Sequence, residues 1–302
     1  MNVIFMGTPD YASEILSALV ADSEINVVAV YTQPDKPVGR KKVMTPPITK
    51  VVALENNLPV YQPTRLRDEE TVSELLEIKC DYIVVAAYGQ ILPKAVLDHA
   101  PCINLHASIL PDYRGASPIQ QAILNGDKET GVTAMMMDVG LDTGDIIKID
   151  KISISDDEMV STLFDRLTVS ATALTLEVLK NFTTYTAVAQ DASQSTHCTK
   201  ITKQEGLVAF DDATTLYNRY RAFTPWPGVY LESGLKIKKM SLVEGEKAHE
   251  AGEILKIDKA SIVVGCTKGS VSIELVQPAS KKEMSVISYL NGKRLSLADT
   301  LA

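Results

Sequence analysis

The chain has 302 residues, of which 45% are hydrophobic and 23% charged. This composition is typical of a soluble globular protein long enough for two domains, and it excludes disordered and fibrous classes. The formal net charge of −8 argues against a polyanionic partner for the molecule as a whole. The sequence opens without a cationic and apolar leader, and no apolar run approaches the ~20 residues that cross a bilayer. We therefore expect a cytoplasmic protein without membrane contact.

The charges are unevenly distributed along the chain, and the cysteines are widely spaced. Residues 207–302 hold 13 basic and 11 acidic side chains, so the acidic excess lies in residues 1–206. The four cysteines are far apart and form no C-x-x-C pair, which indicates reduced thiols and predicts no metal site. Within the acidic part, one stretch is basic enough to contact phosphates, and it contains Lys36, Arg40, Lys41, Lys42 and Lys50.

The first 180 residues alternate short β-rich apolar runs with helical patterns, which predicts a parallel sheet covered on both faces. We expect strands at 2–6, 26–31, 82–87, 103–106, 132–138 and 145–152. We expect helices at 9–20, 47–55, 69–79, 118–124 and 156–181, the last with Ser155 as its N-cap. The fold class is then α/β, with a Rossmann-like parallel or mixed sheet.

The pattern changes after residue 187. Residues 188–206 are polar and aperiodic, which predicts a linker between a domain at 1–187 and a domain at 207–302. The second domain shows a short helix at 212–223 and then closely spaced strands at 229–232, 235–242, 252–257, 261–266 and 271–276. Five short strands joined by tight turns predict a small β-barrel of the oligonucleotide-binding (OB) type.

Two polar side chains lie at the carboxyl end of the apolar run 103–105, where open α/β sheets bind their ligands. Asn104 and His106 point to the same side of a strand because strand side chains alternate. The acidic, glycine-containing loop 137–145 joins two strands of the same sheet, so one of its carboxylates can approach the histidine. A carboxylate, a histidine and an amide together suit acyl transfer without a covalent intermediate.

Two other interpretations stay open at this point. His106 can be a strand-end histidine bonded to a backbone carbonyl, with Asn104 as a turn former. The opening strand and Gly7 also suit a dinucleotide site, but the G-x-G-x-x-G motif that such a site needs is absent.

At these residues the sequence resembles the 10-formyltetrahydrofolate-dependent formyltransferases. The resemblance rests on Asn104-x-His106, Ser108-Ile-Leu-Pro, Arg114-Gly-Ala-Ser-Pro-Ile and Asp142-Thr-Gly-Asp, and it covers essentially the whole chain. Ile109 departs from the leucine that the family mostly has, with volume and apolarity kept. The resemblance implies that Asn104, His106 and Asp142 are catalytic and that no metal takes part. It implies a folate site formed by Tyr88, Gly89, Gln90, Ile91, Leu92, Ser108, Ile109, Leu110, Pro111, Asp138, Val139 and Gly140.

The basic stretch 33–47 is too long for an ordinary strand-to-helix connection. The resemblance implies that it is the insertion with which the tRNA-directed members contact the acceptor stem. Its contacts would be Lys36, Arg40, Lys41 and Lys42, continued by Lys200 and Lys203 and by Arg219, Arg221, Lys236, Lys238 and Lys239.

The implied reaction is formyl transfer from 10-formyltetrahydrofolate to the α-amino group of initiator methionyl-tRNA, by a monomer. The alternatives are a sugar-amine formyltransferase, which would not need the basic stretch, and a hydrolase of the same folate. A further alternative is a non-catalytic RNA-binding module built on the barrel. Independently of these alternatives, the basic stretch can be a solvated surface loop.

Overall fold

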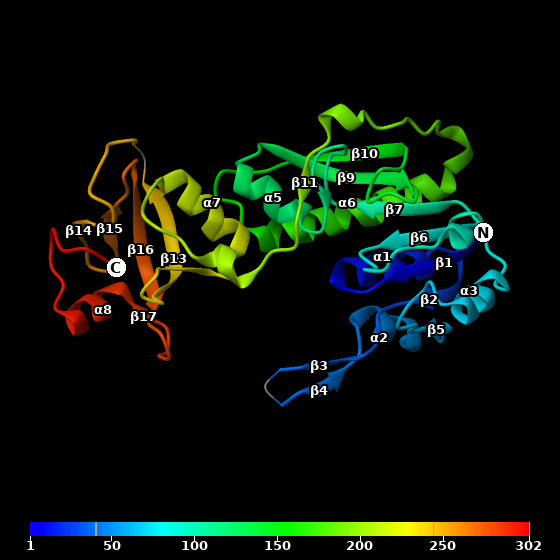
Figure 1. The fold of residues 1–302 in the computed structure, drawn as a ribbon, viewed down its shortest axis with the longest axis horizontal. Coiled ribbons are helices and arrows are strands. Elements are labelled where there is room, and N and C mark those ends of the chain that lie inside the picture. Colours follow the sequence, from blue (N-terminus) through cyan, green and yellow to red (C-terminus); the bar gives the residue numbers. More distant parts are fainter. Residues whose placement is uncertain (40, 244, 302) are drawn as a thin grey trace. The chain divides into compact units, whose positions relative to one another are not determined.

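The structure is a computed structural model that describes residues 1–39, 41–243 and 245–301. Its elements group into two compact units (Figure 1). The first unit comprises residues 1–118, 129–153 and 163–198, and the second comprises 119–128, 154–162 and 199–302. The chain therefore passes between the units more than once, and residues 188–198 belong to the first.

The first unit is built on a seven-stranded sheet with the strand order β10-β9-β7-β6-β1-β2-β5. Strands β7, β6, β1, β2 and β5 pair in parallel, whereas β9 runs antiparallel to both of its neighbours. The sheet is thus mixed, with its antiparallel part at one edge. Its strands are β1 (Asn2–Gly7), β2 (Asn26–Tyr31), β5 (Val60–Tyr61), β6 (Tyr82–Ala86), β7 (Cys102–His106), β9 (Glu129–Met136) and β10 (Ile146–Ser153).

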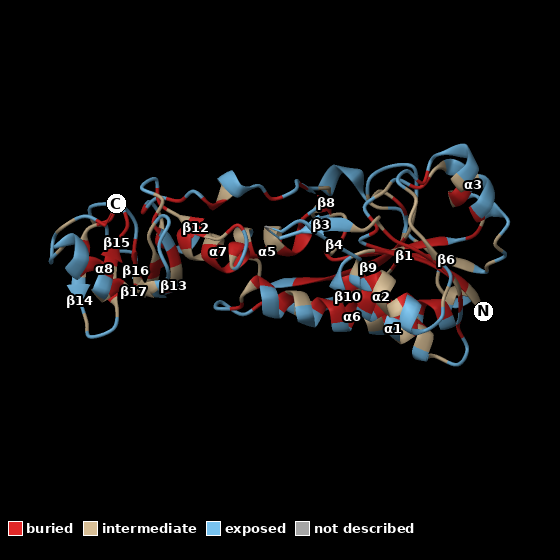
Figure 2. Cartoon of the chain, turned by 90° about the horizontal axis from the view of Figure 1, so that it is seen from below, coloured by how far each residue is buried: buried red, intermediate tan, exposed pale blue. Residues whose placement is uncertain are grey.

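Helices cover both faces of this sheet, and Figure 2 shows α1, α2 and α6 together on one of them. The central strands are buried on both sides, which explains their unbroken apolar sequences. The helices are α1 (Asp10–Ala21), α2 (Ile48–Glu55), α3 (Glu69–Leu76), α4 (Lys94–Leu97) and α6 (Val160–Lys180), with short 3₁₀ turns η1 (Phe182–Thr184) and η2 (Ala192–Gln194). Two short strands, β8 (Arg114–Gly115) and β11 (His197–Cys198), pair with each other in parallel.

One face of the sheet carries a buried apolar cluster that includes Ile4 and Met6 of β1, Ile83 of β6 and Cys102 of β7. Leu75 of α3 packs in the same cluster. Because strand side chains alternate, Asn104 and His106 face the same side of the sheet as Cys102. This face therefore holds both the apolar cluster and the two polar side chains.

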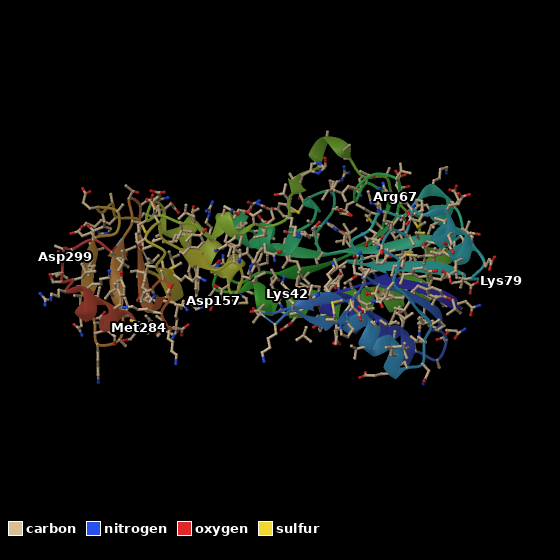
Figure 3. The ribbon with its side chains drawn as sticks, turned by 60° about the horizontal axis from the view of Figure 1, so that its bottom comes forward. Lys42, Arg67, Lys79, Asp157, Met284 and Asp299 are labelled. Atoms are coloured by element: carbon tan, nitrogen blue, oxygen red, sulfur yellow. The ribbon has the colours of Figure 1, made fainter. Side chains whose placement is uncertain are left out.

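The basic stretch forms a β-hairpin of β3 (Lys36–Val38) and β4 (Val43–Thr45). The hairpin extends from the sheet of the first unit in Figure 1, and all six strand residues are exposed (Figure 2). Lys42, labelled in Figure 3, lies in the turn between the two strands. The long strand-to-helix connection that the sequence predicts therefore contains a paired hairpin, while Arg40 lies outside the described residues.

The second unit holds a six-stranded sheet in the order β12-β13-β16-β15-β14, with β17 paired to β16. This confirms the predicted β-rich second domain. Its strands are β12 (Val229–Tyr230), β13 (Lys236–Val243), β14 (Ile254–Ile257), β15 (Ile262–Gly265), β16 (Ser270–Gln277) and β17 (Met284–Ser285). Its helices are α5 (Pro118–Asn125), α7 (Ala213–Phe223), α8 (Val286–Lys293) and the 3₁₀ turn η3 (Lys203–Gly206).

The predicted start of the long helix at residue 156 is wrong, since α6 begins at Val160. Instead, Glu158 N donates to Ser155 O at 3.1 Å, which closes a turn ahead of the helix. The guanidinium of Arg221 donates to the carbonyls of both Ser155 and Glu158. These carbonyls are occupied by a side chain from α7, so the acidic segment is held as a turn.

Arg221 is 4% exposed, and its Nη2 also donates to Asn218 Oδ1 at 2.6 Å. We expect Arg221→Met to lower the free energy of unfolding by about 1–3 kcal/mol, because buried carbonyl oxygens lose their donors. Urea unfolding followed by the fluorescence of Trp226, the only tryptophan, reports on the second unit. The exposed Arg294→Met is the matched control, and an equal midpoint for both variants would contradict the prediction.

Candidate active site

Asn104 and His106 lie on β7, as the sequence predicts, and His106 is 7% exposed. One ring nitrogen, Nε2, lies 2.9 Å from the carbonyl oxygen of Tyr113. A carbonyl only accepts hydrogen bonds, so the network assigns a proton to Nε2. The other nitrogen, Nδ1, lies 3.7 Å from Oδ2 of Asp142. The two interpretations of His106 from the sequence are therefore compatible, because its ring binds a backbone carbonyl and also faces a carboxylate.

The predicted approach of the acidic loop to His106 is present, at a distance slightly longer than a hydrogen bond. Since Nε2 carries a proton in this network, Nδ1 is the ring nitrogen that faces the carboxylate of Asp142. A proton on Nδ1 would lie directly against that carboxylate. Both side chains are largely shielded from water, at 7% and 12% exposed.

Asp142 reaches His106 by an indirect path. Strand β9 runs antiparallel to β7, so it ends beside the start of β7, where Met137 N donates to Cys102 O at 2.8 Å. The loop after β9 then turns back toward the far end of β7. Asp142 adopts the left-handed conformation there, with φ of 53°, and its Oδ2 accepts a hydrogen bond from Gly115 N at 2.8 Å.

Two glycines allow this loop to fold so tightly. A Cβ on Gly140 would lie 2.2 Å from Thr143 Oγ1, and a Cβ on Gly144 would lie 1.8 Å from the carbonyl oxygen of Met136. Neither distance is tolerable for a side-chain carbon. The two glycines of the acidic loop are therefore required by close packing against Thr143 and Met136.

The turn at Ser108–Pro111 is held in place by Thr133, a residue that the sequence pattern did not indicate. Thr133 is fully buried on β9, directly opposite His106. Its hydroxyl donates to Ser108 O at 2.6 Å and accepts from Leu110 N at 3.1 Å. A threonine inside a predicted apolar strand is the only signal that could have suggested it. Ser108 Oγ is also occupied, since it donates to Asp112 O.

Residues 88–92 follow the carboxyl end of β6, beside the end of β7. Tyr88 and Leu92 turn inward and join the apolar cluster, and burial raises the pKa of the Tyr88 hydroxyl. The side chain of Gln90 is bonded to the backbone of Pro63 and Leu66. Ile91 is strongly exposed, at 82%, and Gly89 is exposed as well.

Gly89 takes a positive φ of 79°, and the carbonyl of Tyr88 before it accepts hydrogen bonds from Thr8 Oγ1 and Gln33 Nε2. These bonds tie the end of β6 to the ends of β1 and β2. In the acidic loop, Asp138, Val139 and Gly140 are all exposed, with Val139 at 71%. The residues predicted for the folate thus divide into a buried support and an exposed apolar part.

Cys198 lies beside the same loops, with its Sγ 3.4 Å from the carbonyl oxygen of Tyr113. Burial raises the pKa of this thiol above its ordinary value. The thiolate is the nucleophilic form, so this cysteine is poorly suited to covalent catalysis. Among the described residues, no cluster of histidine, cysteine and carboxylate side chains could hold a metal ion.

The residues predicted to contact tRNA differ in their exposure and in their partners. Lys36, Lys41 and Lys42 are exposed on the hairpin, and none of them forms an ion pair within the described chain. Lys200 and Lys203 are exposed in the second unit. Three of the other basic residues predicted to contact tRNA are engaged within the protein, and the first is Arg219, whose guanidinium donates to the carbonyls of Glu205 and Leu207. Arg221 is buried among backbone carbonyls, so its assignment to tRNA is wrong, and Lys239 pairs with Glu274 at 2.6 Å.

Comparison with known proteins identifies the class. Residues 1–179 match the family model described as formyl transferase, and residues 200–294 match that of the formyl transferase C-terminal domain. A solved N-formyltransferase from Helicobacter canadensis, in complex with folinic acid and dTDP-3-aminofucose, superposes with a TM-score of 0.69. That alignment covers 90% of this chain and 98% of the other at 19% identity, so it supports the fold alone.

Relatives of high identity narrow the class. The chain is 63% identical to a methionyl-tRNA formyltransferase from Sulfurimonas denitrificans, with 100% of both chains covered. It is 54% identical to a methionyl-tRNA formyltransferase from Nitratiruptor, with 99% of both chains covered. The chain therefore belongs to the formyl transferase family and, within it, to the methionyl-tRNA formyltransferases. The predicted family and the α/β fold with a β-rich second domain are confirmed. In the part of the chain that the structure describes, no helix is long and apolar enough to span a membrane.

The contact between His106 and Asp142 generates a direct prediction. Asp142→Asn keeps an oxygen that can accept from Gly115 N but removes the carboxylate charge beside His106. We expect its turnover to fall by at least ~10²-fold, and His106→Ala to fall at least as far, because a proton acceptor is lost. Single-turnover kinetics measure the effect.

Asp145 is an exposed carboxylate three residues further along the same loop. The variant Asp145→Asn is therefore the control for a change of charge alone. A well-folded Asp142→Asn enzyme with wild-type turnover would remove Asp142 from the catalytic group.

Proposed function

We propose that the protein transfers the formyl group of 10-formyltetrahydrofolate to the α-amino group of initiator methionyl-tRNA. The observation that supports this most strongly is the 63% identity over the full chain to a methionyl-tRNA formyltransferase, together with the buried His106–Asp142 pair. A polypeptide of this family with an intact proton-transfer pair is an enzyme rather than an RNA-binding module.

The proposed chemistry is nucleophilic attack of the neutral amine on the formyl carbon. A nitrogen–carbon bond forms, the formyl oxygen becomes an oxyanion, and the amide of Asn104 and the ring of His106 stabilise it. The amine must lose one proton, and the leaving nitrogen of the folate must gain one as its bond to the formyl carbon breaks. Asp142 orients His106 and helps this proton move, directly or through water. The products are formylmethionyl-tRNA and tetrahydrofolate.

The folate is assigned to Tyr88–Leu92, Ser108–Pro111 and Asp138–Gly140. Ile91 and Val139 expose most of their apolar surface, and a planar ligand would remove that surface from water. The hydroxyl of Tyr88 and the amide of Gln90 are buried or engaged within the protein, so these side chains support the site from behind. Backbone groups of the same segments remain to bind polar ligand edges.

The tRNA is assigned to the hairpin and to Lys200 and Lys203. Three lysines of the hairpin are exposed beside Val38, Val43 and Met44, which are 55–60% exposed. Lysines bind phosphates electrostatically, while exposed apolar side chains can pack against a base pair at the end of a stem. Arg40 is assigned with them from the sequence alone.

The acceptor can be tested by direct competition. The protein is incubated with 10-formyltetrahydrofolate and charged initiator tRNA, a dTDP-amino sugar, or buffer alone, and the consumption of the formyl donor is followed. We expect rapid consumption only with the charged tRNA. Faster transfer to the sugar amine, or equal release of formate in buffer, would establish one of the two alternative reactions.

The hairpin generates a second prediction. Replacing Lys36, Lys41 and Lys42 by alanine removes three exposed charges without disturbing a described hydrogen bond or ion pair of their side chains. We expect weaker tRNA binding and a slope of log affinity against log salt that shrinks by roughly 0.7–0.9 for each phosphate that the variant no longer neutralises. The KM for the formyl donor should stay unchanged.

Lys259, Lys281 and Lys282, changed together to alanine, provide a control with the same loss of charge on exposed residues of the second unit. An equal reduction of the salt slope in both variants would show that the effect is one of net charge and not of the hairpin.

A further inference from the structure

Residues 188–198, which the sequence assigns to a linker, bind both loops that carry or support the catalytic pair. We call this segment the strap. At one end, Val188 pairs with Ile146 through two backbone hydrogen bonds of 2.8 and 2.9 Å. At the other end, β11 pairs with β8. The strap therefore runs from the strand after the acidic loop to the strand after the Ser108–Pro111 turn.

The side chain of Gln190 lies at the centre of these contacts. Its Nε2 donates to the carbonyl oxygens of Asp142 and Gly144, at 2.9 and 2.7 Å. Its Oε1 accepts from Nε and Nη2 of Arg114, at 3.1 and 2.7 Å. One amide group thus uses both of its donors and its acceptor to join the acidic loop to β8.

This arrangement holds Asp142 from two sides. Its main chain is held by Gln190, and its carboxylate is held by the N–H of Gly115, the residue that follows Arg114. Arg114 is 5% exposed and so is itself fixed by burial. Because Asp142 is in the left-handed conformation, its backbone needs such support to stay in place.

The strap also supports the partner of His106. Thr196 Oγ1 accepts from Tyr113 N at 2.8 Å, and Tyr113 O is the carbonyl that binds His106 Nε2. The same segment therefore holds the residues on both sides of the His106–Asp142 contact.

We propose that Gln190 is a positioning residue for formyl transfer, which acts by fixing the backbone of Asp142 against His106; this inference rests on the proposed function. Gln190 touches neither reacting group. Its contribution is geometric, since a displacement of about 1 Å at a catalytic group can reduce turnover by up to ~10²-fold.

Two substitutions distinguish the role of the Gln190 side-chain nitrogen from that of its oxygen. Gln190→Ala removes all four hydrogen bonds. Gln190→Glu keeps an oxygen for Arg114 and adds an opposite charge, but it has no N–H to donate to the acidic loop. We expect both variants to lower kcat by about tenfold to 100-fold, with the KM for methionyl-tRNA changed less than twofold. Gln194→Ala, in the same segment but bonded only to Asp191, should keep wild-type kcat.

A double-mutant cycle distinguishes positioning from a general loss of stability. If Gln190 acts through Asp142, then Gln190→Ala introduced into the Asp142→Asn enzyme should lower kcat by less than twofold further. A purely structural role would instead give the same fold-loss in both backgrounds, with a lowered melting temperature. Additive losses, or wild-type kcat in Gln190→Glu, would overturn the proposal. Absence of formyl transfer by the wild-type enzyme would contradict the proposed function on which this inference rests, whereas wild-type kcat in Gln190→Glu would contradict the inference alone.

Discussion

The active site depends on the direction of one strand. Because β9 is antiparallel to β7, the loop that carries Asp142 leaves the sheet at the end of β7 opposite to His106. Four residue steps along β7 separate these ends, a distance of roughly 13 Å at ~3.3 Å per step. The loop must therefore fold back along the sheet, and its glycines, its left-handed Asp142 and its hydrogen bonds to neighbouring segments all serve that path.

Several polar groups of the site are bonded to the backbone, and His106, Ser108 and Thr133 among them are buried. His106 binds the carbonyl of Tyr113, and Thr133 binds both ends of the adjacent turn. A buried polar group without a partner costs free energy, whereas a fully bonded one holds its neighbours in a single arrangement. Formyl transfer needs that arrangement, because an amine, a formyl carbon and a proton acceptor must meet in a fixed geometry. Rigidity at this site is therefore a consequence of hydrogen-bond satisfaction.

The basic side chains outside the site differ in their burial and in their partners. The lysines of the hairpin have no ion-pair partner in the described chain, although acidic residues outnumber basic ones in the molecule. Arg221, by contrast, is buried and organises the turn before α6. Basic side chains of the same charge thus have separate roles. The exposed lysines of the hairpin are free of ion pairs in the described chain, whereas the buried Arg221 stabilises a turn. An acidic body with an exposed basic hairpin favours one orientation of a polyanionic partner.

The sequence by itself determined six of the seven strands of the central sheet, because their apolar runs are visible in a single chain, whereas the two-residue strand β5 was not predicted. It also singled out Asn104, His106 and Asp142 as candidate site residues, since the motifs that carry them are local. The start of α6 and the buried role of Arg221 depend on partners distant in the chain, so local pattern could not show them. The hairpin pairs residues close in the chain, but its two strands are only three residues long and fully exposed, so they leave no hydrophobic pattern. Only the tertiary structure decided that Thr133 supports the turn and that Gln190 holds Asp142. Residues 188–198 have the pattern of a linker because their hydrogen bonds go to other segments and leave no periodicity of their own.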